Sequence, residues 1–445
     1  MAFALAHPNK GLFMKTFDRR DFIGSVAAAG AALLATPTLR AQRAQRNTQF
    51  ATRKAPDGRL LKAGLIGCGG RGRGAAANFF DAGPNLQITA LADVFPDRVA
   101  EARKLLKQAR GIDVPESNCF SGFDAYEKLI NTDVDIVLNA TPPHFRPAHF
   151  AAAVAAKKHC FLEKPIAVDA VGVRSVMETA DKAASLGLSV MTGTQLRREL
   201  SRIETRKRIL DGVIGDIVAM RAFRNQGALW YRERQPQWSD MEYMIRDWVN
   251  WTWLSGDHVV EQHIHHVDAI YWVFGKPPVR TVGMGGRARR PTGDQYDFFS
   301  ADYTFDRNVH LHSTIRQLNG CANVRDESFV GTKGVAEITG VITDLSGKEV
   351  WRYDGPEVDS VVQEHADMVT AIRADKPVNT AKETAFSTLM TIMARDSAFT
   401  GKAISWEEAM ASNERLGPTE YVLGPVNLKP VAPVPGEPPA QTSMR

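Results

Sequence analysis

The stretch HVVEQHIHHVD, residues 258–268, gathers the side chains most able to do chemistry. It contains four of the chain's eleven histidines and two carboxylates. A neutral imidazole can take up a proton near pH 7, and imidazole and carboxylate groups can also bind zinc. Three interpretations are open: an acid/base centre, a metal site, and polar residues that only stabilise a helix. The side chains concerned are His258, Glu261, His263, His265, His266 and Asp268.

The metal interpretation requires His258, Glu261 and His265 to share one face of a helix. A helix that begins early in the segment would place them so, because residues three and four positions apart are neighbours on its surface. The spacing matches no known zinc pattern, and the nucleotide-binding loop described next leaves a metal without a task. We therefore predict no metal site.

A glycine-rich loop, GCGGRG, follows a short apolar run and opens a predicted helix. In the spacing G-x-G-x-x-G, the first glycine permits a tight turn and the second lets the backbone approach a pyrophosphate. The third allows close packing of helix on strand. The diphosphate would lie at the helix N-terminus, where free N–H groups favour anions. The loop residues are Gly67, Gly69, Gly70, Arg71 and Gly72.

Asp93 ends the second predicted strand, 26 residues after Gly67. A carboxylate at this point of a dinucleotide-binding domain binds the ribose hydroxyls of adenosine and repels a 2′-phosphate. We therefore predict NAD as the cofactor rather than NADP.

Two further motifs each follow a predicted strand. NATPPHF places Thr141, Pro142 and His144 beside the nicotinamide half of the cofactor, and LEKPIA places Glu163 and Lys164 at the mouth of the next strand. Taken alone, the first motif could be an ordinary proline turn and the lysine a solvated surface residue.

Five of the eight tryptophans lie between residues 230 and 253, interleaved with charged residues. Aromatic faces stack on sugar C–H surfaces while polar groups bind hydroxyls, so the segment is typical of carbohydrate recognition. The alternative is that the tryptophans anchor a long loop or a subunit contact. The predicted substrate-binding residues are Gln195, Arg197, Trp230, Tyr231, Arg246, Trp248, His263 and His265.

The elements that position these residues follow two different sequence patterns. Strands alternate with helices over residues 61–194, which predicts an α/β domain with a Rossmann-type, doubly wound parallel sheet. Residues 195–416 alternate polar and apolar positions and then return to helical patterning, which predicts an α+β domain with an open, mostly antiparallel sheet. Residues 42–60 are predicted as a linker and 417–445 as a proline-rich extended tail.

The N-terminal residues 1–41 are typical of an export signal. Arg19 and Arg20 directly precede an apolar run from Phe22 to Leu34, which is too short to span a bilayer, and a small-residue cleavage point follows near Ala41. We predict a twin-arginine signal peptide, recognition by the twin-arginine export machinery, and a periplasmic mature protein with no membrane span.

Composition bounds the remaining function classes. The chain of 445 residues is long enough for two domains, and 44% hydrophobic and 24% charged residues are ordinary for a soluble globular protein. A net charge of +5 is small for this length and gives no argument for a nucleic-acid partner or a membrane surface. Four scattered cysteines predict no disulfide framework.

The glycine loop, TPPH, EKP, GTKGVAEI and GKAISWEEAM together resemble the glucose–fructose oxidoreductase/inositol dehydrogenase (Gfo/Idh/MocA) family over about residues 60–415. The resemblance implies that Lys164 and His265 meet at the reacting carbon, with Glu261 at the position of a family Asp. Glu261 is one methylene longer than that Asp, and His263 stands where the family often has Gly. It also fits a homodimer or homotetramer formed through the C-terminal sheet.

Three functions compete at this stage. The first is an NAD-dependent oxidoreductase acting on a carbohydrate or polyol, with hydride transfer to a tightly held nicotinamide. The second is a redox-neutral glycosidase or lyase that works through a 3-keto sugar and regenerates NAD. The third is a cofactor-binding scaffold without catalysis, which a lysine and a histidine at the nicotinamide argue against.

Overall fold

A computed structural model describes residues 53–427, 431–437 and 443–444 of the chain. The predicted signal peptide and residues 42–52 of the predicted linker lie outside this part. The linker residues that are described lie against the first domain, where the Ala55 N–H donates to the carbonyl oxygen of Ala82. No helix in these ranges is long and apolar enough to cross a membrane.

The first domain is built on a six-stranded parallel sheet, as predicted. Its strand order is β3-β2-β1-β4-β5-β6, and strands that follow one another in the chain are joined by helical crossovers. The strands are β1 (Leu61–Ile66), β2 (Leu86–Asp93), β3 (Cys119–Ser121), β4 (Ile136–Asn139), β5 (His159–Leu162) and β6 (Val190–Thr192). The helices are α3 (Gly70–Asp81), α4 (Pro96–Arg110), α5 (Ala125–Ile130), α6 (Arg146–Ala155) and α7 (Ala170–Ser185).

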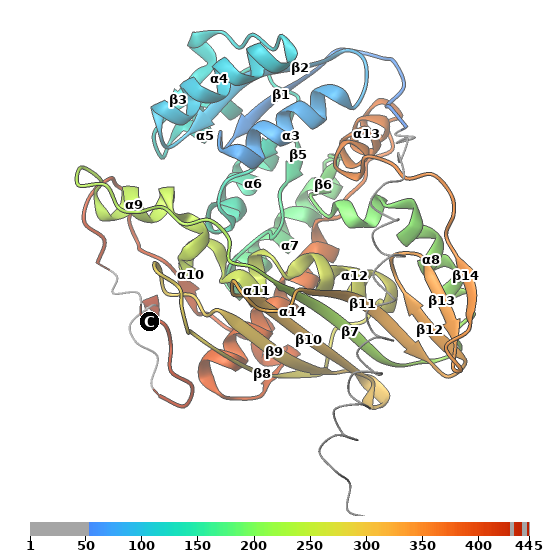
Figure 1. Cartoon of the computed structure of the whole chain (residues 1–445). Helices are drawn as coiled ribbons and strands as arrows, with labels where there is room; N and C mark the ends of the chain where they lie inside the picture. The colour runs from blue at the N-terminus through green and yellow to red at the C-terminus, as the bar shows by residue number, and fades with distance from the viewer. Residues whose placement is uncertain (1–52, 428–430, 438–442, 445) are drawn as a thin grey trace, which may run out of the picture. The chain divides into compact units, whose positions relative to one another are not determined.

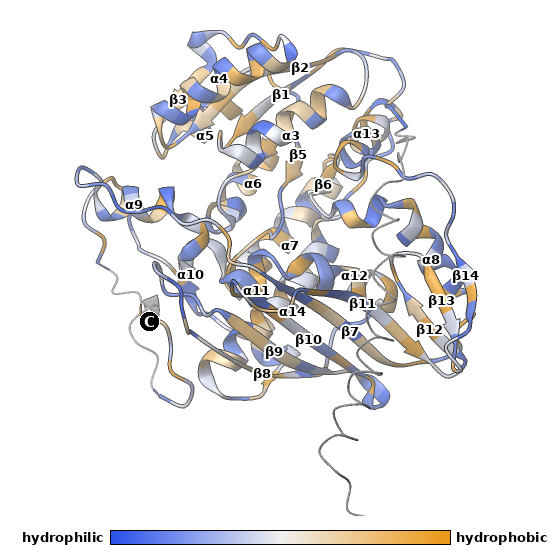
Figure 2. Cartoon of the chain, in the orientation of Figure 1, coloured by the Kyte–Doolittle hydropathy of each residue, from blue (hydrophilic) through white to orange (hydrophobic). Residues whose placement is uncertain are grey.

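Strands β1, β4 and β5 are apolar along almost their whole length because helices cover both faces of this sheet. The helices, by contrast, have one apolar face and one polar face. Figure 2 shows polar residues on the outward side of α4 and apolar residues along the strands. The carboxyl ends of all six strands share one edge. Loops that carry the predicted cofactor residues leave the sheet there.

The second domain is built on a nine-stranded sheet in the order β14-β13-β12-β11-β7-β10-β9-β8-β15. All neighbouring pairs are antiparallel except β7 and β10, which run parallel. The strands are β7 (Ile217–Gln226), β8 (Arg280–Gly286), β9 (Phe298–Thr304), β10 (His310–Gln317), β11 (Val324–Gly331), β12 (Gly334–Glu337), β13 (Val341–Asp344), β14 (Glu349–Arg352) and β15 (Ile404–Ser405).

Helices cover one side of this second sheet. Figure 1 shows α11 and α12 on the side of the nine-stranded sheet that faces the nucleotide-binding domain. The helices are α8 (Leu200–Leu210), α9 (Asp240–Arg246), α10 (Thr252–Ser255), α11 (His258–Glu261), α12 (Ile264–Phe274), α13 (Ser360–Arg373), α14 (Ala381–Thr400) and α15 (Trp406–Ala411). The opening histidine segment thus forms two short helices with a break at Gln262 and His263, rather than one.

Two helices from the C-terminal part of the chain pack on the first domain. Helix α13 lies against α3, and its residues Val362, Ala366 and Val369 belong to the same apolar core as strand β1. Helix α14 packs on α7 as well as on β8. The nucleotide-binding domain is therefore completed by residues far beyond its predicted end at residue 194.

The C-terminal segment, predicted as an extended tail, makes specific contacts with both domains in its described parts. The Tyr421 hydroxyl lies 2.6 Å from Nε2 of His144, and the Tyr296 hydroxyl donates to the carbonyl oxygen of Pro433 at 2.7 Å. Strand β16 (Arg415–Leu416) pairs with β17 (Ser443–Met444).

Candidate functional site: a dinucleotide cleft with a lysine–glutamate–histidine centre

The glycine loop between β1 and α3 has the geometry of a phosphate cradle. Gly67 has φ +94°, and a Cβ there would lie 2.7 Å from the backbone of Ala140. A Cβ on Gly72 would overlap the carbonyl oxygen of Gly67, so only glycine permits this packing. Gly69 and Gly70 have open space at the Cβ position, which leaves their backbone accessible at the N-terminus of α3. These residues fit a dinucleotide.

Asp93 is the last residue of β2 and lies beside this loop. Its Oδ2 accepts the Cys68 N–H at 2.7 Å and its Oδ1 accepts the Phe95 N–H at 3.0 Å. Burial raises the pKa of Asp93, while the two N–H donors oppose that shift. The backbone thus holds the carboxylate at the cavity wall, where it can face ribose hydroxyls.

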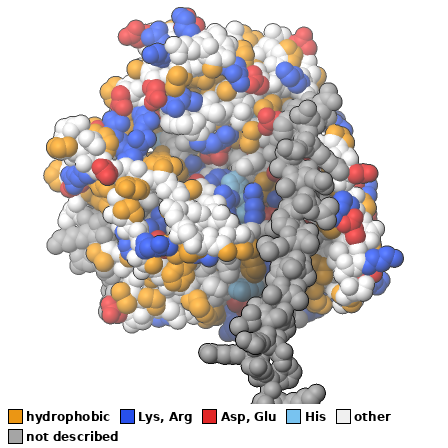
Figure 3. Space-filling model, viewed as in Figure 1, with side chains coloured by type: hydrophobic (Ala, Val, Ile, Leu, Met, Phe, Trp, Pro, Cys, Tyr) orange, Lys and Arg blue, Asp and Glu red, His pale blue; other side chains and the backbone are white. Residues whose placement is uncertain are grey.

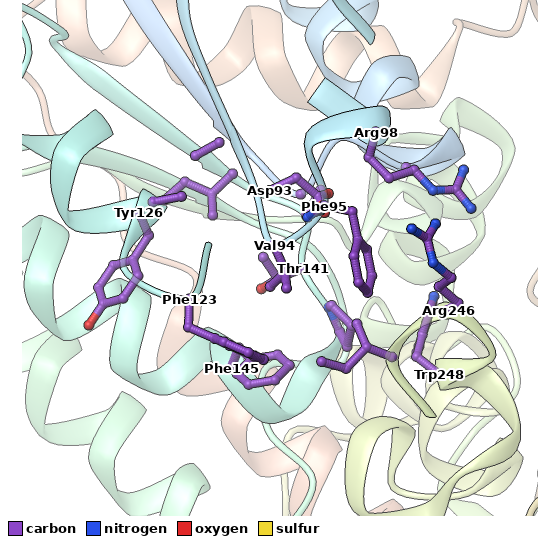
Figure 4. Close-up of a pocket in the computed structure, with 18 of the residues that line it drawn as sticks. Asp93, Val94, Phe95, Arg98, Phe123, Tyr126, Thr141, Phe145, Arg246 and Trp248 are labelled. Atoms are coloured by element: carbon purple, nitrogen blue, oxygen red, sulfur yellow. Dashed lines mark hydrogen bonds between the residues drawn. The ribbon is translucent and has the colours of Figure 1, made fainter. Parts of the chain in front are cut away.

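One cavity extends from the glycine loop past Asp93 to the second domain (Figure 4). Thr141 and Pro142, which we predict to bind the cofactor, line this cavity. Trp230, Arg246 and Trp248 line it as well, although sequence reasoning placed them at the sugar. Their role in sugar binding stays a prediction. In the structure these three side chains line the same cavity as Asp93, at the end where the adenosine would bind.

Arg246 connects the two domains at this cavity. Its guanidinium donates to Oδ1 and Oδ2 of Asp97 in the first turn of α4, at 2.9 and 3.0 Å, and lies 4.0 Å from the ring centre of Phe95. The remaining Nε–H donates to Glu242 of α9 at 2.8 Å. Figure 4 shows Arg246 beside Phe95 and Arg98.

The tryptophan-rich segment is anchored by its own apolar cluster. Trp251 and Trp253 are buried together with Met241 of α9 and with Phe95 of the nucleotide-binding domain. Tyr231, by contrast, is about half exposed. Two of the five tryptophans thus stabilise the segment, as the alternative interpretation of the sequence proposed, while two others reach the cavity.

His144 of the TPPH motif is used inside the protein. Its ring packs against Trp253 at a centroid distance of 4.9 Å and meets the Tyr421 hydroxyl at Nε2. Burial lowers the pKa of His144 to about 3, so the ring is neutral at physiological pH. His144 is not among the residues that line the cavity beside the glycine loop. Its predicted contact with the cofactor therefore stays a prediction.

Glu163 is fixed behind the glycine loop by Arg71. The Nε of Arg71 donates to Oε1 of Glu163 at 2.5 Å, and Glu163 is buried. A Cβ on Gly193 would approach this carboxylate to 2.7 Å, so the neighbouring strand end leaves space for it. Glu364 of α13 lies nearby; burial raises the pKa of its carboxyl and the charge of Glu163 raises it further. The predicted cofactor residues Arg71 and Glu163 thus form one ion pair.

Lys164 of the first domain and Glu261 of the second meet between the two domains. The Lys164 Nζ donates to Oε1 of Glu261 at 2.8 Å and to the carbonyl oxygen of Glu261 at 2.7 Å. Burial by itself would raise the pKa of Glu261, but the Lys164 charge and hydrogen bond keep it below its usual value. An ammonium group has three donors, and this contact uses two of them.

His265 lies in the first turn of α12 beside this ion pair. Burial lowers its pKa well below the usual value, and the positive charges of Lys164 and Arg224 lower it further. The ring is therefore a neutral imidazole at pH 7. Of the four histidines in the segment, His265 is the one whose ring is partly accessible and makes no hydrogen bond within the described residues.

The other three histidines have partners within the protein. Nδ1 of His258 lies 2.8 Å from Asp257, Nε2 of His263 lies 2.7 Å from the Ser313 hydroxyl, and Nδ1 of His266 is bonded to Glu327. Within the described ranges no three His, Cys, Asp or Glu side chains are placed to hold a metal ion.

Gln195 and Arg197 begin the chain after β6. The Arg197 guanidinium forms a buried ion pair with Asp268 at 2.8 Å and also contacts Glu383. These contacts occupy its donors, and its assignment to substrate stays a prediction, as does that of Gln195.

Sequence reasoning missed three residues near His265: Arg224, Gln262 and Arg325. Arg224 on β7 donates to Oε1 of Gln262 at 2.9 Å, and Arg325 on β11 pairs with Arg224 across the strands. No spacing in the sequence joins residues 224 and 325. Only the sheet register brings them to one place.

Comparison with known proteins gives matches to both domains. The family model described as "Oxidoreductase family, NAD-binding Rossmann fold" matches residues 61–192, and the "GFO/IDH/MocA C-terminal domain" model matches residues 203–337. A "Glycosyl hydrolase family 109 protein 1" of Bacteroides fragilis is 35% identical over 125 residues, 28% of this chain and 26% of that protein.

Two dehydrogenases match over longer regions. An inositol 2-dehydrogenase of Acidothermus cellulolyticus is 26% identical over 53% of this chain and 60% of its own length. A D-glucoside 3-dehydrogenase of Escherichia coli is 24% identical over 65% of this chain and 80% of its length. The structure of a putative oxidoreductase from Thermotoga maritima superposes with a TM-score of 0.62, covering 78% of this chain and all of that one. At 21% identity the last likeness shows a shared fold.

Proposed function

The chain belongs to the Gfo/Idh/MocA oxidoreductase family, and from this premise we propose that it is an NAD-dependent oxidoreductase of carbohydrates or polyols. The observation that carries the proposal is the contact of Lys164 with Glu261 next to the neutral ring of His265. These groups come from the two domains and meet near the carboxyl edge of the nucleotide-binding sheet. A sugar bound there would have a base and a hydrogen-bond donor at one hydroxyl.

The residues support oxidation of a carbinol as follows. The bound nicotinamide would supply the hydride acceptor. A ring nitrogen of His265 takes the hydroxyl proton, and the third N–H of Lys164 stabilises the oxygen as its charge develops. Glu261 fixes the ammonium in position through two acceptors on one residue. A longer side chain than Asp still satisfies this role, because the carboxylate and the carbonyl oxygen of Glu261 converge on Nζ.

The finer parts of the proposal concern the cofactor and the compartment. A carboxylate such as Asp93 at the end of the second strand supports NAD over NADP, and Arg19-Arg20 support export to the periplasm by the twin-arginine route. Free NAD would be scarce there, so we propose that the cofactor is retained and recycled by a second substrate. We also propose a homo-oligomer formed through the nine-stranded sheet.

A second candidate is a redox-neutral glycosidase that acts through a 3-keto sugar. The observation in its favour is the 35% identity to the family 109 glycosyl hydrolase, although that match spans about a quarter of the relative. In this cycle the oxidised carbon would acidify its neighbour, elimination would release the aglycone, and the nicotinamide would be reoxidised in the same turnover.

The test combines the nucleotide and the products. The purified protein is denatured, the released nucleotide is identified by mass spectrometry, and the native protein is incubated with a panel of sugars, polyols and glycosides. We expect NAD, and a keto sugar or aldonate formed together with reduced cofactor. Release of free sugar from glycosides without net reduction would support the second candidate. Absence of nucleotide and of all turnover would refute both.

A further inference from the structure

A pair of arginines faces the second domain's helices near the proposed reaction centre. Arg224 on β7 and Arg325 on β11 are directly opposite each other in the antiparallel register. They project to the same face as Met220 and Ala222 of β7, because side chains alternate along a strand. That face is the one covered by α12, which carries His265.

This arrangement includes no direct ion pair within the described ranges, and the charges of Glu261 and Glu327 offset the repulsion at Arg224 only in part. Like charges directly opposite on neighbouring strands repel. Arg224 donates only to neutral oxygens, those of Gln226 and Gln262, and neither arginine forms an ion pair within the described ranges. Burial lowers the pKa of Arg224, and the charge of Arg325 lowers it further.

The acidic groups nearby already have partners. Glu327, two residues after Arg325, is held by Arg202 and His266. Glu261 is held by Lys164, and the Gln262 side chain that receives Arg224 also donates to Glu261. Neither arginine therefore has a carboxylate of its own as a direct partner in the described part of the chain, and the oxidised nicotinamide would add a further positive charge near this centre.

Arg224 and Arg325 lie away from the glycine loop, where the cofactor phosphates would bind. Neither arginine lines the cavity that runs from the glycine loop past Asp93. Both act on His265, because their charges contribute to lowering its pKa. Figure 3 shows lysine or arginine atoms next to histidine atoms inside a hollow near the middle of this face of the molecule. A ligand bound at His265 would lie close to both arginines, because Arg224 donates to Gln262 just before α12 and Arg325 is opposite Arg224 in the sheet.

We propose that Arg224 and Arg325 bind an anionic group on the sugar substrate, a carboxylate or a sulfate or phosphate ester. The inference rests on the proposed function and narrows its substrate class to acidic sugars. Guanidinium groups suit this task because they present paired donors to the oxygens of such anions. An anion would neutralise the cross-strand repulsion, and its fixed place would orient the sugar hydroxyl toward His265 and Lys164.

The test uses glucose with its charged counterparts glucuronate, glucose 6-phosphate and glucose 6-sulfate on the full-length enzyme with its bound nucleotide. Reduction of the nicotinamide is followed by absorbance, and binding by the shift of Tm. We expect at least one charged sugar to exceed glucose in kcat/KM and in Tm shift. The charged sugar that does so identifies the anion.

Variants then connect the preference to the arginines. Arg325→Gln should lower kcat/KM for the preferred charged sugar by about tenfold or more, mainly through KM, and Arg224→Gln should do the same. The readout is the ratio of kcat/KM for the charged sugar to kcat/KM for glucose, which should fall in both variants. Arg221→Gln is the matched control, because Arg221 lies on the other face of β7, paired with Asp326. It should leave the preference unchanged.

The outcomes separate this inference from the proposed function. Equal or higher kcat/KM for glucose, with no selective loss in Arg325→Gln, would overturn the inference and leave the oxidoreductase proposal standing. Binding of a charged sugar that needs Arg325 but never reduces the nicotinamide would support the inference and count against the oxidoreductase proposal. No Tm shift with any charged sugar would also overturn the inference.

Discussion

At the scale of single residues, the structure ties the proposed chemistry to His265 and Lys164. We expect His265→Ala to lower kcat by about 10² to 10⁴, the usual contribution of a positioned general base, with nucleotide content unchanged. Lys164→Ala should cost a similar factor. The double variant should lose much less than the product of the two factors, because both side chains act on one proton transfer.

Steady-state kinetics on these variants give the answer, with His258→Ala as the control because its ring is bonded to Asp257 away from Lys164. If His258→Ala and Glu261→Ala were as damaging as His265→Ala, and a chelator abolished activity, the segment would be a metal site after all.

Asp93 carries the choice between the two nicotinamide cofactors. Its two oxygens accept the backbone N–H groups of Cys68 and Phe95, so a change of side chain alters both the ribose contact and the support of the glycine loop. We expect Asp93→Ser to weaken NAD binding and to reduce the ratio of the affinity for NAD to the affinity for NADP. Calorimetric titration of both nucleotides into the stripped protein measures this. Release of NADP from the native enzyme would contradict it.

Several of these residues could be predicted from the sequence because each follows a strand in a known motif. Asp93 ends β2, and Gly67, Gly69 and Gly72 form the turn that the spacing requires. His144 could not be assigned in this way. Its ring contacts Tyr421, nearly three hundred residues later, and no local pattern encodes such a contact.

At the scale of elements, the segment that includes α9 spans from the second domain to the adenosine end of the cofactor cavity. Arg246 holds it there through both oxygens of Asp97 and the ring of Phe95. We expect Arg246→Ala to raise the dissociation rate of the bound nucleotide by about tenfold, since a bidentate charged contact and a cation–π contact are lost together. Stopped-flow displacement by excess nucleotide measures this rate.

Arg234→Ala is the matched control for that experiment. Arg234 belongs to the same segment, but it pairs with Asp240 of the segment itself and does not reach the nucleotide-binding domain. An equal acceleration in Arg234→Ala, or none in Arg246→Ala, would show that the segment does not retain the nucleotide.

Element types were predicted better than element partners. Alternating strands and helices over residues 61–194 predicted the parallel sheet, and polar–apolar alternation predicted the second, mostly antiparallel sheet. The parallel pairing of β7 with β10 and the return of α13 to α3 depend on long-range packing. The location of the tryptophan-rich segment could not be predicted either. Its composition indicated a ligand-binding role but not which end of the cleft the segment lines.

At the scale of the whole molecule, buried histidines make stability depend on pH. Burial lowers the pKa of His144, His149 and His365 to about 3 each, against about 6.5 in an unfolded chain. Below pH 6.5 the unfolded chain therefore binds more protons. The free energy of unfolding should fall by about 1.4 kcal/mol per histidine for each pH unit, down to about pH 3. Asp294, whose pKa burial raises to about 6, opposes this over a narrower range.

Thermal unfolding at pH 7.5 and pH 5.5 tests this expectation, and Tm should be lower at pH 5.5. His365→Phe is the informative variant, because the ring stacks on Phe161 and neither nitrogen has a partner in the described residues. Its Tm should depend less on pH than that of the native protein. The same pH dependence in both proteins would contradict the assignment.

Export belongs to the same scale because the twin-arginine route carries whole folded proteins. Changing Arg19 and Arg20 to Lys keeps the charge and removes the guanidinium pair. We expect the precursor of the double variant to remain in the cytoplasm, as judged by cell fractionation. An unchanged periplasmic yield would argue decisively against the predicted signal.

The packing of α13 on α3 also sets the order in which the protein can mature. Residues 360–373 leave the ribosome long after β1 and α3, yet they supply part of the core beneath the glycine loop. During synthesis the first domain exposes an apolar surface until α13, the helix that covers this surface, has been made. The cradle for the dinucleotide is thus complete only after residues 360–373 have been made. Loading of the cofactor therefore follows synthesis of the nine-stranded sheet up to β14.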